Sequence, residues 1–170
     1  MSNRVAGSYT ANRVEISLGL PVLPGGQAVE IPGLPPGLTL PHTVDGRATD
    51  AFLSVTRETP TNSKVTGSDG EVIVAESLNR SGQFAITLQV SSLTNIVLSS
   101  MLALWESGTK FFFPVTVIDL DSFGSLYEAN ECWIQGWPEA AFAASPGSIA
   151  WVLEAGVLRM SHGGRGVVGQ

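Results

Sequence analysis

The sequence predicts a mainly β fold, an antiparallel β-sandwich or barrel with one flanking α-helix at about residues 92–106. About seven short segments alternate apolar and polar residues with period two, as half-buried strands do. Only one segment has the spacing of an amphipathic helix. The chain has 170 residues, which suits a single domain, 1–170, with a sizeable core.

The N-terminal part predicts one strand followed by a proline-rich arm. Val14, Ile16 and Leu18 lie on one face of the strand. Six prolines follow in the segment at about 21–45, and proline cannot donate a ladder hydrogen bond, so we expect an insertion or extended arm there. A solvated linker would be polar. We therefore expect the apolar residues of the arm to pack on another surface, such as a neighbouring copy: Val22, Leu23, Val29, Ile31, Leu34 and Leu38.

The middle of the chain predicts three strands and one long polar connection. Residues 52–57, 71–75 and 84–90 have strand character, and the last of these has the cleanest alternation. Between the first two lies Glu58–Gly70, which is rich in Thr, Asn, Ser and Gly and contains the turn signal Asp69-Gly70. A connection of this length usually carries a function.

The period changes after residue 91, where one amphipathic helix is predicted. Ser92 suits the N-cap, and Gly108 stands where a C-terminal stop belongs. The apolar stripe of this flanking helix is formed by Leu93, Val97, Met101, Leu104 and Trp105.

The C-terminal third predicts a hairpin and a last strand. Segments 111–119 and 126–134 are joined around Asp121, and a final strand covers 150–155 with an extension towards Met160. Asp119 and Asp121 could hold calcium or act as an acid/base pair, but turn chemistry explains them more simply. A flexible Gly-rich tail is expected at about 163–170.

The charge content points towards self-assembly and away from nucleic-acid binding. Charged residues make up 14% of the chain, against about 25% in ordinary soluble domains, so much of the surface must be neutral, as subunit interfaces are. The net charge is −6, and the nine Lys and Arg residues are scattered, which argues against a phosphate-binding surface. The uncharged stretch 81–105 contains Gln, Asn and Ser, so no membrane insertion is expected.

No catalytic or metal-binding motif is present in the sequence. His42, His162 and the single Cys132 have no zinc-ligand spacing, and no Gly-x-Ser-x-Gly elbow occurs. We therefore predict no enzyme activity, no catalytic residue, no metal and no cofactor. The four tryptophans could form a sugar-binding platform, although core or interface positions are commoner for such residues: Trp105, Trp133, Trp137 and Trp151.

Seven segments of strand and turn follow one another in a recognisable order. They are SVTRE at 54–58, GSDGE at 67–71, SGQFAITLQ at 81–89, SSLTN at 91–95, FFPVTVID at 112–119, ECWIQ at 131–135 and WVLEA at 151–155. This series resembles the tail tube (inner tail tube, phage structural) proteins of contractile-tailed bacteriophages, which are related in fold to the type VI secretion tube protein. The proline-rich arm departs from that family pattern.

The resemblance implies a structural virion protein of the phage tail, assembled in the host cytoplasm. Hexameric rings of such proteins stack into a hollow tube inside a contractile sheath, and viral double-stranded DNA passes through without specific binding. The implied partners are further copies of the chain, the tail sheath protein, and baseplate or initiator and tail terminator proteins. The arm is then expected to contact the sheath or another subunit. The long connection is expected to reach the adjacent ring through Glu58, Thr61, Asn62, Ser63, Lys64, Val65, Thr66 and Asp69.

Two other readings remain open at this level. Another virion component of similar size, such as a tail terminator, tail tip or head decoration protein, would share the neutral surface. A carbohydrate-binding β-sandwich would instead use the tryptophans.

Overall fold

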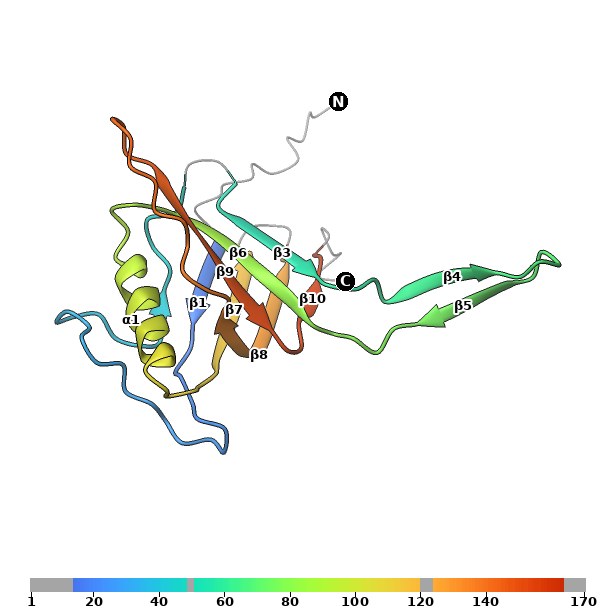
Figure 1. Cartoon of the computed structure of the whole chain (residues 1–170), viewed down its shortest axis with the longest axis horizontal. Coiled ribbons are helices and arrows are strands. Elements are labelled where there is room, and N and C mark those ends of the chain that lie inside the picture. Colours follow the sequence, from blue (N-terminus) through green and yellow to red (C-terminus); the bar gives the residue numbers. More distant parts are fainter. Residues whose placement is uncertain (1–13, 49–50, 120–123, 164–170) are drawn as a thin grey trace, which may run out of the picture.

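The computed structural model describes residues 14–48, 51–119 and 124–163. These residues form ten strands and one helix, drawn in Figure 1. The elements are β1 (Val14–Leu18), β2 (His42–Thr43), β3 (Leu53–Arg57), β4 (Asn62–Thr66), β5 (Val72–Glu76), β6 (Gly82–Gln89), α1 (Thr94–Glu106), β7 (Phe113–Asp119), β8 (Leu126–Ile134), β9 (Ser148–Ala155) and β10 (Arg159–Ser161). The predicted class, mainly β with one flanking helix, is confirmed.

One antiparallel sheet carries the body in the order β2-β1-β7-β8-β9-β6-β3, with β10 beside β8. The sheet folds over at β8. The first half of β8 lies between β7 and β10, whereas Cys132–Ile134 pair with β9, and the register with β7 shifts between Phe113 and Val115. In Figure 1, β3, β6 and β9 therefore cross over β1 and β7 as a second layer.

Alternate residues of both layers meet in one core. Phe84, Ile86 and Leu88 of β6 are fully buried, as the period-two pattern predicts. Ile16 and Leu18 of β1 face them from the other layer. Burying such apolar side chains supplies the main driving force for folding.

Helix α1 closes one side of the body (Figure 1). Its buried residues Val97, Leu98, Met101 and Leu102 pack into the core. Trp105 is half-buried, but Leu93 lies at the N-cap position and is exposed, so it does not belong to the buried stripe. No helix in the described ranges is long and apolar enough to cross a membrane.

Two boundaries differ from the sequence prediction. The segment Glu58–Gly70 is not simply a connection, because it contains β4, which pairs with β5 in a separate two-stranded sheet. Strand β4 is exposed on both faces, so the sequence shows no apolar alternation there. The C-terminal strand is two strands, β9 and β10, because the chain leaves the ladder at Gly156 and β10 pairs with β8 instead of β6.

The arm is an extended segment that folds back on its own body. Val22 bridges both Ala28 and Phe112, and β2 pairs with β1. Its apolar side chains pack against this chain's own core, where a contact with a neighbouring copy was among the expectations. The partly buried members of the arm are Leu23, Val29, Ile31, Leu34, Leu38 and Leu40.

Candidate assembly surfaces

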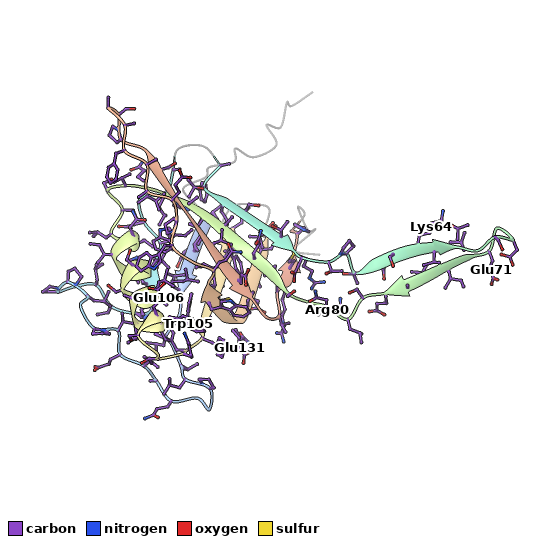
Figure 2. All side chains as sticks on the ribbon, in the orientation of Figure 1. Lys64, Glu71, Arg80, Trp105, Glu106 and Glu131 are labelled. Atoms are coloured by element: carbon purple, nitrogen blue, oxygen red, sulfur yellow. The ribbon has the colours of Figure 1, made fainter. Side chains whose placement is uncertain are left out.

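The hairpin of β4 and β5 projects from the body as its most prominent feature (Figure 1). All ten of its strand residues are exposed. The turn is closed by Gly67 N–H, which donates to the Glu71 carbonyl at 2.8 Å, while Gly70 has a φ of +86° that suits glycine. Figure 2 shows Lys64 and Glu71 near the far end of this hairpin.

Polar contacts hold the base of the hairpin against the body. The Arg57 guanidinium donates to the Leu158 carbonyl at 2.9 Å and to Thr61 Oγ1 at 3.2 Å. Nearby, Arg80 and Glu76 form an ion pair at 3.1 Å. Arg57 thus links the first leg to β3 and to the segment before β10. The second leg meets that segment where the Leu158 N–H donates to the Arg80 carbonyl at 2.8 Å, so the hairpin leaves the body in a defined direction.

A second cluster at the base centres on the Glu58 carboxylate. Its Oε2 accepts hydrogen bonds from Ser81 Oγ and from Asn79 Nδ2, the latter at 3.5 Å. These hydrogen bonds, with that from Ser81 the stronger, lower the pKa of Glu58. The carboxylate therefore stays ionised at neutral pH and is used in a structural contact.

The residues assigned to the inter-ring connection are brought together on this one projecting element. Glu58 lies at the base and Asp69 in the turn, where its carboxylate accepts the Glu71 N–H at 3.2 Å. The others lie on or beside β4: Thr61, Asn62, Ser63, Lys64, Val65 and Thr66. Their contact with another ring stays a prediction.

The outward face of the β3-β6-β9 layer is a second candidate surface. Its side chains are small or neutral, and Glu154 is the one charged residue among them. They are Ser54, Thr56, Gln83, Ala85, Thr87, Gln89, Ser148, Ala150, Val152 and Glu154. In the sequence, the only signal of this face is the polar residue at every second position of the alternating strands.

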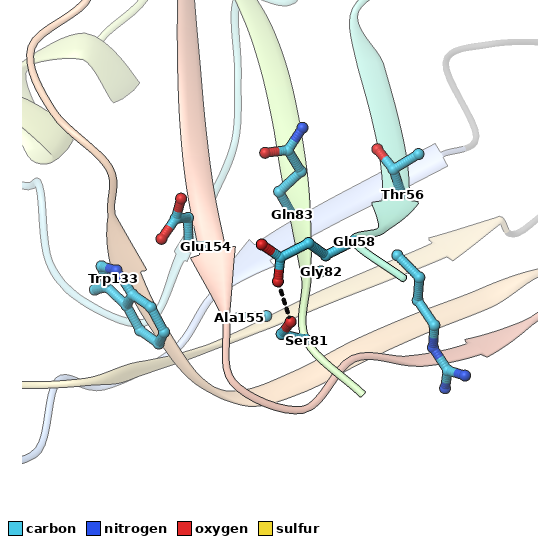
Figure 3. Close-up of a pocket in the computed structure, with 9 residues that line it drawn as sticks. Thr56, Glu58, Ser81, Gly82, Gln83, Trp133, Glu154 and Ala155 are labelled. Carbon is cyan, nitrogen blue, oxygen red and sulfur yellow. Dashed lines mark hydrogen bonds between the residues drawn. The ribbon is translucent and has the colours of Figure 1, made fainter. Parts of the chain in front are cut away.

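Figure 3 shows a hollow of about 350 Å³ at the hairpin end of this face. Glu58, Gln83 and Glu154 line it together with Trp133. The Glu154 carboxylate accepts a hydrogen bond from Gln135 Nε2 at 3.0 Å. In the described part of the chain, no group of three or more His, Cys, Asp or Glu residues could hold a metal ion.

The arm meets the N-terminus of α1 in a hydrogen-bonded junction. Asp45 Oδ1 accepts from Thr94 Oγ1 at 2.8 Å, from Ser92 Oγ at 2.9 Å and from the Thr94 N–H at 3.2 Å. Ser92, the predicted N-cap, lies one residue before the N-cap position. It still caps the helix, because its Oγ accepts a hydrogen bond from the Thr94 N–H at 3.2 Å. No local pattern in the sequence marks Asp45 as a helix cap, because it lies 49 residues before Thr94.

Protonation at this junction follows from the same contacts. Partial burial opposes ionisation of Asp45, but hydrogen bonds from Thr94 and Ser92 outweigh it and lower its pKa. The Thr94 hydroxyl gives its single proton to Asp45, so His42 Nε2, 2.9 Å from Thr94 Oγ1, carries the hydrogen and donates. Burial lowers the pKa of His42, so the ring is neutral at pH 7.

The other predicted positions fall into structural roles. Cys132 is buried, and burial raises the pKa of its thiol to about 12. Trp151 is buried and donates to Asn95, whereas Trp137 donates to Glu106 at 2.8 Å. Trp137 is 52% exposed, whereas Trp151 is buried and Trp105 and Trp133 are half-buried, so the four tryptophans do not form one exposed row. Asp121 and residues 164–170 lie outside the described residues; the Asp119 N–H donates to the Ser125 carbonyl at the hairpin end.

The chain is thus a β protein with a curled antiparallel sheet, one flanking helix and a projecting, exposed hairpin. The family model of the bacteriophage PhiTE tail tube protein matches residues 37–163, about three quarters of the chain. The chain belongs to this tail tube protein family, which is structural and non-enzymatic. The matched region includes the hairpin, α1 and every strand except β1, whereas β1 and most of the arm precede it.

Solved structures share the fold at low sequence identity. The tube-terminating cap of the anti-feeding prophage has a TM-score of 0.50 at 8% identity, covering 94% of this chain and 96% of that one. The PVC extracellular contractile injection system has two similar chains with TM-scores of 0.48 and 10% identity. The match to its sheath/tube terminator covers 93% of this chain and 99% of the terminator chain. The match to a chain of its extended sheath-tube complex covers 93% of this chain and 94% of that chain. No curated protein matches the chain.

Proposed function

We propose that this chain is the subunit that builds the inner tail tube of a contractile phage. Hexameric rings stack end to end, a contractile sheath encloses the tube, and the viral genome passes through the lumen. The observation that carries the proposal is the β4-β5 hairpin, which projects from the body with ten exposed strand residues. An isolated two-stranded hairpin is marginally stable in water, so an element of this kind gains stability when another chain covers it.

The polar face of the β3-β6-β9 layer supports its assignment as the lumen wall. Its neutral residues and its one carboxylate, Glu154, present no cation to DNA phosphates. DNA carries about one negative charge per 1.7 Å of axis, so a wall with lysines or arginines would retain it. A neutral to acidic wall lets the genome slide.

The arm suits the outer surface of the tube, where the sheath lies. It is attached at Phe112, next to β7, in the layer opposite the polar face. A narrow lumen leaves little room for such a segment. The remaining partners, a baseplate or initiator complex and a terminator, would contact the two ends of the stack.

Negative-stain electron microscopy of the purified chain over a concentration series tests this function. We expect rings and long hollow tubes from the wild type. A variant in which residues 61–77 are replaced by a short Gly-Ser turn should still fold, because these residues lie outside the core, and should yield rings without tubes. A wild-type chain that forms neither rings nor tubes at any concentration contradicts the proposal.

The same images separate a tube subunit from a terminator. A tube terminator is the second candidate because the fold is also similar to that of a tube-terminating cap. A terminator ends at one ring, so single rings that never stack, and that bind only to the ends of added tubes, would favour that role.

A further inference from the structure

An apolar loop projects from the body between β8 and β9. It covers residues 135–147, which we call the aromatic loop, and residues 139–147 are all exposed. Phe142 is 98% exposed, more than any other large hydrophobic residue in the described part of the chain, and alanines flank it on both sides. The described residues make no hydrogen bond, ion pair or ring contact with residues 139–147. A continuous apolar surface of this kind is typical of a contact with another molecule.

The base of the aromatic loop is held against the body. Trp137 Nε1 donates to Glu106 Oε1 of α1 at 2.8 Å, and the centroid of its ring lies 6.3 Å from that of Trp151 in β9. Pro138 and Pro146 flank the exposed part, and proline fixes the φ angle of each position. Because the loop is restrained at both ends, covering Phe142 costs less ordering entropy than covering a side chain on a free segment.

The proline-rich arm offers a surface of matching chemistry. Glu30 is the only charged residue between positions 19 and 41. The first turn of the arm, residues 23–28, is closed by the Gly26 N–H, which donates to the Leu23 carbonyl at 2.9 Å. In this arm turn, residues 24–28 are all exposed and uncharged, and they begin with Pro24. Proline-rich segments commonly dock against aromatic side chains, and Phe142 is such a side chain.

The aromatic loop and the arm turn lie on opposite sides of the body. In Figure 1 the loop projects above α1, the arm lies below it, and both are away from the β4-β5 hairpin. The arm turn is the first turn of the blue segment that follows β1, at the lower edge of the view. A chain with these two surfaces on opposite sides can contact one neighbour through its loop and another through its arm turn. Such a heterologous contact produces a closed ring when the rotation between copies closes.

From this arrangement we infer that Phe142 packs against the arm turn of a second copy of the chain in the same ring. The inference rests on the proposed function and adds to it a contact that involves the arm, whose first turn lies outside the matched region 37–163. A large aromatic side chain buries roughly 150–250 Å², so covering Phe142 removes most of its surface from water. The single carboxylates of the two surfaces, Glu139 and Glu30, lie at the rim of the contact, where interfaces are polar.

Two hollows of the described surface fit Phe142 less well than the arm turn does. The hollow in Figure 3 is lined by Glu58 and Glu154. A second hollow is lined by Glu128, Glu131 and Arg159. A phenyl ring in either hollow would remove charged groups from water without giving them a partner, which is costly.

Cysteine cross-linking tests the contact. In an A143C/Q27C variant, which keeps Phe142, a short bis-maleimide should join neighbouring copies into a ladder of covalent multimers on a denaturing gel. The ladder should end at the number of copies that micrographs show in one ring. Cys132 is buried and does not compete. The matched control is A143C/V157C, because Val157 is 56% exposed but lies beside Leu158 at the hairpin base, and it should give no ladder.

Substitution of Phe142 gives an independent readout that needs no cross-linker. F142D should raise the protein concentration at which rings form, measured by sedimentation velocity, by about tenfold or more, because it places an unpaired carboxylate in the contact. F142L keeps an apolar side chain and should stay within about threefold of the wild type. The matched control is L78D, at a residue that is 86% exposed near the hairpin base, and it should leave ring formation unchanged. Because Phe142 is 98% exposed in the single chain, F142D should unfold at the wild-type temperature as a monomer.

The outcomes separate this contact from the proposed function. Tubes in the micrographs together with no ladder from A143C/Q27C, or with equal ladders from both cysteine pairs, overturn the contact and leave the tube function standing. Equal ring formation by F142D and L78D has the same meaning. A ladder that runs past the ring number also overturns the contact, since it indicates that the loop joins one ring to the next. A wild type without rings or tubes removes the proposed function itself.

Discussion

Replacing Asp45 by alanine should loosen the junction between the arm and α1. The substitution removes the acceptor of the hydrogen bonds from Thr94 Oγ1 at 2.8 Å and from the Thr94 N–H at 3.2 Å. The Ser92 hydroxyl keeps the Asp45 main-chain carbonyl, at 2.7 Å, as an acceptor. The substitution also removes a negative charge from the N-terminus of a helix, where the helix dipole favours one. Loss of a helix cap lowers the unfolding free energy by about 1 kcal/mol. Because Asp45 is exposed, we expect a total loss of about 1.5 kcal/mol.

Thermal unfolding of the non-assembled protein measures this loss. For a domain of this size, about 1.5 kcal/mol lowers Tm by roughly 3–6 °C. D45N separates charge from hydrogen bonding, because its amide oxygen still accepts while the carboxylate charge is gone. E30Q, which neutralises an exposed carboxylate of the arm, serves as the control and should leave Tm unchanged.

The Tm difference between wild type and D45N should depend on pH, because the pKa of Asp45 is lowered in the folded state. A carboxyl whose pKa is lower in the folded state stabilises the fold above its ordinary pKa of 3.8, and this contribution disappears as the pH falls through the folded value. The Tm gap between wild type and D45N should therefore be full at pH 6 and should shrink as the pH falls below 3.8 and through the lower pKa of the folded state. A D45A variant with wild-type Tm at pH 7, or a gap that widens on acidification, refutes this reasoning.

Three further predictions concern the body of the molecule. A Cβ at Gly82 would lie 2.5 Å from the Thr56 carbonyl oxygen, so G82A should cost about 1–3 kcal/mol in unfolding free energy, whereas G136A, with open space around it, should be neutral by chemical denaturation. The buried thiol of Cys132, with its pKa raised to about 12, should react with a thiol reagent at pH 8 only after unfolding, and rapid labelling of the native chain would contradict its placement. Finally, T87K places a cation on the polar face; DNA retention by assembled tubes should rise and be reversed by salt, while the same substitution at exposed Thr39 of the arm should leave retention unchanged.

The sequence by itself determined the elements whose side chains alternate between core and solvent. Strands β1, β6 and β9 were predictable because burial of every second residue leaves a period-two pattern, as in Phe84, Ile86 and Leu88. Helix α1 was predictable from its change of period and from Gly108, which has a φ of +114° directly after the C-cap. The order of these segments was also enough to indicate the tail tube family.

Only the tertiary structure decided two kinds of feature: those made by contacts between residues distant in sequence, and strands that contact no core. Strand β4 is exposed on both faces, so no pattern marked it, and pairing with β5 alone makes it a strand. Asp45 completes the N-terminus of α1 from 49 residues away, a distance that no local cap rule covers. Local periodicity records which residues are buried, but it carries no information on which surfaces the folded chain places at its two ends.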